Sequence, residues 1–343
     1  MKISRLLGAI AVCSLALPAT AETTMRVMGQ PAATGLIQKN VEGPFFADFA
    51  ASTGLDITAE FQPADVTGIK DTEQLRVLKS GLFDIISLRL SQVSRDEPTI
   101  LGLDLVGLNP DYDTGKETVA AFASVVDERL QEQFNTKLLG VWPFGPQVLF
   151  CEPEISSLAD LKGLKVRVYD QNLANFISLV GGTPVPLSFG DVQQSLARGV
   201  VDCAITGPSS ANSAGWPEVT SYMMPIAFQL AMNGYGMNLD TWNALSAEEQ
   251  EKMQAAFNTL TDDIWAYSEE LFVDAVRCNV GQEPCETGTP YNLTLVEPTE
   301  ADLALIGTAV TDVSFPAWKE ICDVTNPACS SDWMETVGVS KNF

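Results

Sequence analysis

Short apolar runs alternate with amphipathic stretches along the first part of the chain, which is the pattern of strands separated by helices. The predicted strands lie at residues 25–28, 57–61 and 83–88. Gly54 and Gly81 follow the two intervening helical stretches, and glycine commonly ends a helix. Because each connecting helix returns the chain in the same direction, this order predicts a mostly parallel sheet.

The same order of elements restarts in the second part of the chain. The predicted strands there lie at residues 165–169, 183–187 and 200–206. Residues 196–203 also repeat the pattern of residues 78–85, a helix end, a glycine and an apolar strand with one aspartate. Pro184 and Pro186 suit an edge strand. The fold class is therefore α/β, with two lobes that are each a mostly parallel sheet flanked by helices.

Two segments are expected to cross between the lobes, residues 144–150 and residues 228–238. Residues 246–276 contain no proline or glycine, and Ser246 with Glu249 forms a capping-box pattern. The apolar positions recur at three- and four-residue steps, which predicts one helix that runs along both lobes. The alternative is two helices with a break near residues 261–262.

The length of the chain also favours two lobes, because a single core usually stops growing at ~250–300 residues. We assign residues 22–143 and 229–270 to lobe I, and residues 144–228 and 271–330 to lobe II. Residues 331–343 are expected to form a C-terminal tail.

The first 21 residues have the pattern of a signal peptide. Lys2 and Arg5 precede an apolar stretch at residues 6–17, which is too short to span a bilayer. Small residues follow, so we predict cleavage after Ala21 and export to the periplasm. Lipidation of Cys13 is the alternative, but Val12 is a poor residue before a lipidated cysteine.

The charge of the chain limits its partners. It carries 44 acidic and 20 basic residues, a formal net charge of −24. Such a surface repels nucleic acid and anionic lipid. An anionic ligand would therefore need a local cation.

Six cysteines remain after the signal peptide is removed, and an even count in an exported chain favours disulfides. Two local pairs of equal spacing stand out, which leaves Cys151 with Cys203. Those two cysteines could instead be small buried apolar residues. The local pairs are Cys278 with Cys285, and Cys322 with Cys329.

The absence of histidine argues against an enzyme. With no histidine in the chain, a serine triad and the commonest metal ligand are both excluded. Nucleotide-binding and nucleophile motifs are missing as well. Paired carboxylates could still hydrolyse glycosides. A binding protein without a metal or cofactor is the better interpretation.

Arg167 is the strongest candidate for ligand binding. It alternates with Val166 and Val168 on a predicted strand, and ligands of open α/β sheets bind at the carboxyl ends of strands. Its guanidinium offers a planar fork that matches a carboxylate. The alternative is a structural arginine paired with a surface acid. Further candidates lie at predicted strand ends or loops, namely Trp142, Phe144, Gln147, Phe189, Thr206, Trp216 and Asn238.

Several motifs occur together in this chain. Residues 157–168 read SLADLKGLKVRV, residues 182–187 read GTPVPL, residues 199–202 read GVVD, and Glu218-Val219 is followed by Tyr222. In this combination the chain resembles the solute-binding proteins of TRAP transporters, the dicarboxylate (DctP) type. The resemblance covers nearly the whole chain after the signal peptide.

The resemblance implies a two-lobed periplasmic-binding-protein fold and a monomeric receptor that closes on a small organic acid. It implies delivery of that acid to the membrane permease subunits of a TRAP transporter. It also implies that Arg167 grips a carboxylate. The chain lacks the basic residue that is common in the family near Gln147, so the resemblance supplies no second carboxylate grip.

Three other functions are compatible with parts of the pattern. A receptor of the ABC type would have the same architecture and a different permease. A sensor subunit would pass its ligand state to a membrane kinase. A secreted hydrolase would need a fixed pair of carboxylates in the cleft.

Overall fold

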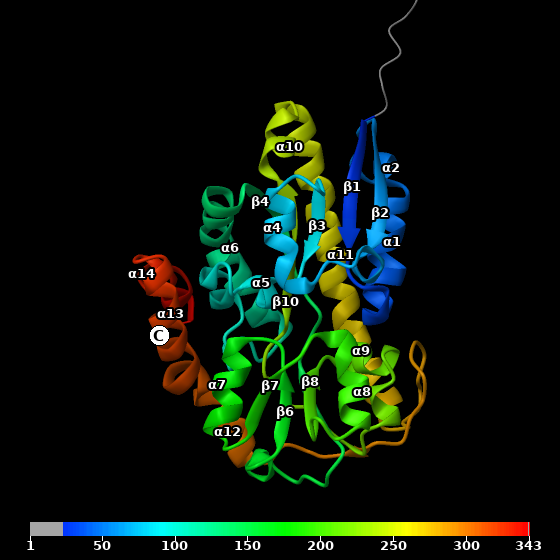
Figure 1. Cartoon of the computed structure of the whole chain (residues 1–343), viewed down its shortest axis with the longest axis vertical. Helices are drawn as coiled ribbons and strands as arrows, with labels where there is room; N and C mark the ends of the chain where they lie inside the picture. Colours follow the sequence, from blue (N-terminus) through cyan, green and yellow to red (C-terminus); the bar gives the residue numbers. More distant parts are fainter. Residues whose placement is uncertain (1–22, 342) are drawn as a thin grey trace, which may run out of the picture.

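The computed structural model describes residues 23–341 and residue 343, so the predicted signal peptide lies outside the described residues. Two lobes are stacked along the longest axis of the molecule, each built on one sheet (Figure 1). The strand order is β2-β1-β3-β10-β4 in lobe I and β11-β9-β5-β8-β6-β7 in lobe II. The predicted two-lobed α/β fold is confirmed.

The sheet of lobe I consists of β1 (Thr23–Gly29), β2 (Ile57–Pro63), β3 (Ile85–Leu88), β4 (Thr136–Pro143) and β10 (Met232–Asn238). Strand β1 pairs in parallel with β2 and β3, whereas β10 is antiparallel to both β3 and β4. The described helices of this lobe are α1 (Gly43–Ala47), α2 (Phe49–Thr53), α3 (Ala64–Thr67), α4 (Gln74–Lys79), α5 (Leu90–Val93), α6 (Tyr112–Phe134) and α10 (Leu239–Ala244).

The sheet of lobe II consists of β5 (Val148–Cys151), β6 (Lys165–Val168), β7 (Thr183–Pro186), β8 (Cys203–Thr206), β9 (Tyr222–Met224) and β11 (Thr294–Leu295). Here β5 runs against both of its neighbours. The reversed strand of each sheet is thus the one that enters directly from the other lobe. Strand β7 lies at the edge, as Pro184 and Pro186 require. The helices are α7 (Gln171–Leu179), α8 (Val192–Ala197), α9 (Pro208–Ser213) and α12 (Glu300–Ala309).

One uninterrupted helix, α11 (Ala247–Asn279), passes along both lobes (Figure 1). In lobe I, Trp265 donates its indole N–H to the Val141 oxygen at 2.9 Å. In lobe II, the Asn279 amide donates to the Pro208 oxygen at 3.0 Å. The prediction of one helix is therefore confirmed, and the alternative of two broken helices is wrong. No helix in the described part of the chain is both long and apolar enough to cross a membrane.

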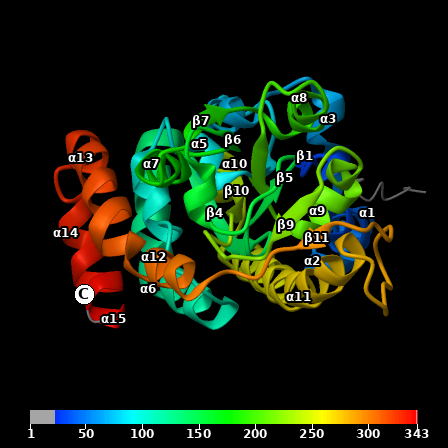
Figure 2. The same ribbon diagram turned by 90° about the horizontal axis from the view of Figure 1, so that it is seen from below.

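The C-terminal segment packs on lobe I. Helices α13 (Phe315–Thr325) and α14 (Cys329–Trp333) lie beside α6 in both views (Figures 1 and 2), and Figure 2 shows α15 (Val339–Lys341) beside it as well. The Trp318 and Trp333 indoles donate to main-chain oxygens of residues 98 and 102, each at 2.8 Å. Residues 315–330 therefore pack against the core of lobe I, although we had assigned them to lobe II, and residues 331–341 form helix where a tail was expected.

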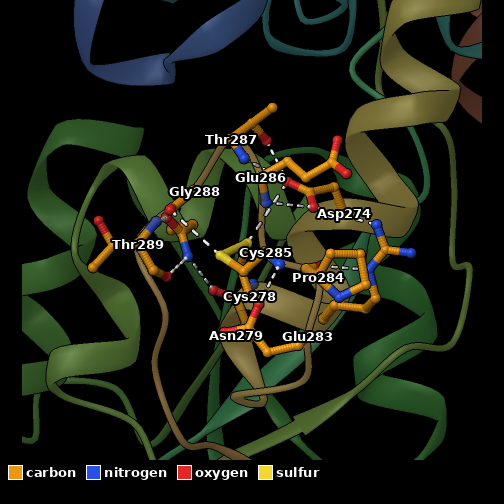
Figure 3. The surroundings of a disulfide bond; sticks show 12 residues. Asp274, Cys278, Asn279, Glu283, Pro284, Cys285, Glu286, Thr287, Gly288 and Thr289 are labelled. Carbon is orange, nitrogen blue, oxygen red and sulfur yellow. Dashed lines mark hydrogen bonds and ion pairs between the residues drawn. A yellow bond between two sulfur atoms is a disulfide. The ribbon is translucent and has the colours of Figure 1, made fainter.

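All six cysteines of the described chain form disulfides, in the three predicted pairs. Cys151 and Cys203 are direct neighbours on the antiparallel strands β5 and β8, so they are not unpaired buried residues. The Cys278–Cys285 bridge ties a loop to the end of α11 (Figure 3). The Asp274 carboxylate holds the same loop by accepting from the main-chain N–H groups of Glu286 and Thr287, each at 2.9 Å.

Candidate ligand-binding site between the lobes

A cavity lies between the two lobes. Its wall combines the carboxyl end of β3, the amino end of β10 and the carboxyl ends of β6 and β8. The lobes touch beside it, because Ser210 Oγ of α9 donates to the Thr34 oxygen at 3.3 Å. The described conformation is therefore closed. The lining residues are Arg89, Ser91, Gln92, Phe144, Gln147, Arg167, Tyr169, Phe189, Thr206, Ser210, Ala231, Met232 and Asn233.

Arg167 projects from β6 into this cavity and is only 1% exposed. Its Nε donates to the Leu187 oxygen at 3.1 Å, and its Nη1 donates to the Ile205 oxygen at 2.8 Å. These bonds use two of the five guanidinium N–H groups and leave three for another partner. Within residues 23–341 no acid forms an ion pair with Arg167, so the alternative of an arginine paired with a surface acid is not met.

Aromatic rings support the charge of Arg167. Its guanidinium carbon lies 5.5 Å from the ring centre of Tyr169 and 5.7 Å from that of Trp216. The negative face of an aromatic ring attracts a cation at such distances. Burial and the positive charge of Arg89 lower the pKa of Arg167 to about 9, so the group is still protonated at neutral pH.

Arg89 is a second cation in the cavity and comes from lobe I, directly after β3. It is 7% exposed, and its Nη1 forms an ion pair with Asp71 Oδ2 at 3.1 Å. Its guanidinium carbon lies 5.7 Å from the ring centre of Phe189 in lobe II. The two lobes therefore present like charges to the same space.

Five of the predicted site residues line the cavity together, namely Arg167, Phe144, Gln147, Phe189 and Thr206. The other three do not line it. Trp216 is fully buried behind Phe189, with their rings stacked at 5.5 Å. Trp142 is fully buried in the core of lobe I, where it packs on Phe144 with ring centres 5.2 Å apart.

Asn238 caps the amino end of α10 and donates its amide to the Leu78 oxygen at 2.9 Å. Asn238 lies far from the cavity because of the direction in which β10 runs. Because β10 runs against β3, the amino end of β10 reaches the carboxyl end of β3, with Gly234 opposite Leu88. Asn233 lines the cavity as a result, and Asn238 lies at the opposite edge of the sheet.

Sequence reasoning missed Arg89, although the rule that selected Arg167 also applies to it. Arg89 directly follows the predicted strand at residues 83–88, at the carboxyl end where ligands bind. Asn233 was missed because the pattern does not show that its strand is reversed. In the described part of the chain, no cluster of three or more His, Cys, Asp or Glu side chains is placed to hold a metal ion.

The two crossing segments pair with each other beside the cavity. The main-chain N–H of Phe144 donates to the Ala231 oxygen at 3.1 Å, and that of Gln147 donates to the Gln229 oxygen at 2.8 Å. The Gln229 side chain accepts from the Tyr169 hydroxyl at 3.1 Å and donates to Asp170 Oδ2 at 3.2 Å. These paired segments form a short ribbon that can act as a hinge between the lobes.

Two buried carboxyl groups lie next to this hinge. Burial raises the pKa of Asp170 to about 7 and that of Asp104 to about 6. Asp104 Oδ1 accepts from the main-chain N–H of Leu230 at 3.1 Å, whereas its Oδ2 has no hydrogen-bond partner among the described residues. Below a pH of about 6, a proton on this carboxyl group removes the buried charge.

A two-lobed α/β fold with a buried, unpaired cation in the cleft defines a class, the solute receptors that close on a small ligand. The profile of the family described as bacterial extracellular solute-binding protein, family 7 (DctP), matches residues 37–277. The chain belongs to this family, and the resemblance to TRAP-transporter solute-binding proteins is confirmed.

The chain is similar to several characterised proteins. It is 25% identical over 270 residues to the sialic acid-binding periplasmic protein SiaP of Vibrio cholerae, which is 76% of this chain and 81% of the relative. A TRAP periplasmic solute-binding protein from Desulfovibrio salexigens, solved with orotic acid, has a TM-score of 0.79 at 16% identity, over 92% of this chain and 98% of that one. An extracytoplasmic solute receptor from Bordetella pertussis that binds pyroglutamic acid has a TM-score of 0.77 at 18% identity, over 91% and 99%.

Proposed function

We propose that this chain is an exported receptor that binds a small organic acid between its lobes and delivers it to the membrane subunits of a TRAP-type transporter. The observation that carries the proposal is Arg167, a buried guanidinium with three unused N–H groups at an inter-lobe cavity. A carboxylate matches such a fork through two parallel hydrogen bonds. The solved relatives with orotic acid and pyroglutamic acid support the same class of ligand.

Electrostatics couple ligand binding to closure in this proposal. Closure brings Arg89 of lobe I and Arg167 of lobe II to one cavity, where their like charges repel. A bound anion placed between them replaces this repulsion by attraction. The acid therefore stabilises the closed form more than the open form, which is the differential affinity that a ligand needs to shift an equilibrium.

The receptor is proposed to release its ligand unchanged and to act as a monomer, with the first 21 residues removed on export. Support for a role without catalysis comes from the absence of histidine in the chain. Incubation of the identified acid with excess protein should return it intact. A new product whose amount follows the protein concentration would refute the receptor function.

A thermal-shift screen of organic acids on protein stripped of bound ligand tests the proposal. An acid at 100 times its dissociation constant stabilises the fold by ~2.7 kcal/mol, which is readily seen as a higher melting temperature. Positive acids are then titrated by calorimetry. The proposal fails if uncharged sugars or amines bind and no organic acid does.

A further inference from the structure

In the closed conformation, the positive charges around the cavity outnumber the negative charges that pair with them. Two guanidinium groups face the cavity, but only Arg89 has an acidic partner, Asp71, at 3.1 Å. Both members of that pair are nearly buried, with 8% and 13% of their side chains exposed. Arg167 has no such partner among the described residues. The wall together with Asp71 therefore carries one uncompensated positive charge.

The other lining residues add no charge. Burial and the neighbouring Asp170 raise the pKa of the Tyr169 phenol well above its usual value, so this group is neutral. The polar residues that remain are amides and hydroxyls, among them Ser91, Gln92 and Thr206. These three side chains have no hydrogen-bond partner within the described chain, so they are free to bind neutral polar atoms of a ligand.

We infer that this site selects acids with a single negative charge, and that Asp71 is the residue that rejects dianions. The inference rests on the proposed function and specifies the substrate class. One carboxylate satisfies Arg167 and brings the charge of the closed cavity to zero. A second carboxylate would have to compete with Asp71 for Arg89, or stay buried without a partner, and buried unpaired charges are strongly unfavourable.

The polarity of the cavity wall fits this class of ligand. The neutral side chains favour hydroxyl, amide or carbonyl groups on the rest of the ligand. Asp170 lines the adjoining pocket, which shares Ser91, Gln92 and Tyr169 with this one, and its negative charge disfavours a dianion further.

The test compares acids of the same shape that differ by one charge. Malonate, succinate and glutarate are titrated against malonamate, succinamate and glutaramate, in which an amide replaces one carboxylate. With the unmodified protein, the monoamide of a binding pair should bind at least tenfold more tightly. In Asp71→Asn the freed Arg89 can accept a second carboxylate, so this preference should fall by at least tenfold.

Asp96→Asn is the matched control, because Asp96 pairs with Arg76 at 2.9 Å and does not line the cavity. It should leave the preference unchanged. The inference is overturned if the unmodified protein binds any dicarboxylate as tightly as its monoamide, or more tightly. It is also overturned if Asp71→Asn shows the same preference for the monoamide as the unmodified protein.

If none of the six compounds binds, the acid found in the thermal-shift screen decides. A monoanion at pH 7 supports the inference, and a dianion overturns it. The absence of any acidic ligand would refute the proposed function itself, which is a different result.

Discussion

Arg167 is oriented by main-chain oxygens before any ligand arrives, so its unused N–H groups are already directed at the cavity. Loss of this partner leaves a buried carboxylate unpaired, at a cost of ~2–5 kcal/mol. Arg167→Ala should therefore weaken binding of the identified acid by roughly 30-fold to several thousand-fold in calorimetric titration. Arg167→Lys keeps the charge without the fork and should recover only part of the affinity.

Arg198→Ala is the control for this series, because Arg198 is exposed in the same lobe and does not line the cavity. Arg167→Ala also removes two hydrogen bonds to main-chain oxygens, so the free energy of unfolding without ligand should fall by about 1–3 kcal/mol. Near-normal affinity in Arg167→Ala would show that this arginine only supports the strands.

Asp104 makes the stability of the chain depend on pH. Burial raises its pKa from 3.8 to about 6, so the folded protein holds this proton more tightly than the unfolded chain does. The stability that this group contributes then falls as pH rises from about 4 to about 6, and the full penalty is present above that range.

Asp104→Asn should therefore be more stable than the unmodified protein at pH 8, by up to about 3 kcal/mol, and the gain should shrink at pH 4. The change breaks no hydrogen bond at Oδ2, the oxygen that the amide nitrogen replaces. Urea unfolding at both pH values measures the gain. Asp263→Asn, at an exposed position on α11, is the control, and a variant that is less stable at pH 8 contradicts the argument.

At the residue level, the sequence selected Arg167, which lines the cavity between the lobes. The alternation of Arg167 with Val166 and Val168 identified the cation. A sequence pattern does not show, however, whether a strand that crosses between the lobes runs parallel or antiparallel to its new neighbours. That is why Asn238 was chosen in place of Asn233. Trp142 was misjudged for a related reason, because a position near a strand end does not say which face of the sheet its side chain occupies.

At the level of elements, α11 is one rigid connection whose continuity can be tested. Ala266 is exposed near the middle of the helix, so a substitution there acts on the backbone alone. Ala266→Pro removes a main-chain hydrogen bond and should lower the free energy of unfolding by ~3 kcal/mol or more. Ala266→Gly, the control, should cost about 1 kcal/mol. Equal effects of the two substitutions in urea unfolding would mean that the helix is already broken there.

The periodicities predicted the strands and α11 because these elements bury one regular face. The C-terminal helices were harder to place. Trp318 and Trp333 are clearly apolar anchors in the sequence, but their partners are main-chain oxygens of residues 98 and 102, more than 200 residues earlier in the chain. A local pattern carries no information about such a distant partner.

For the whole molecule, the like charges of Arg89 and Arg167 predict an open form without ligand. Small-angle scattering should give a smaller radius of gyration when the identified acid is added to the stripped protein. Arg167→Ala at the same acid concentration should show no such change. A radius that is the same with and without ligand would mean that closure does not depend on the anion.

The two sheets also differ in how far apart in the sequence their strands lie. Five of the six strands of lobe II come from residues 148–224, whereas lobe I lacks β10, which lies between β3 and β4, until residue 238 is available. Contacts between distant segments form slowly because a long loop must close first. In pulse-labelled hydrogen exchange during refolding, the amides of β5, β6 and β8 should be protected before those of β10. Earlier protection of β10 would contradict this order. Lobe II, most of which follows the first part of lobe I in the chain, is thus expected to fold before lobe I is complete.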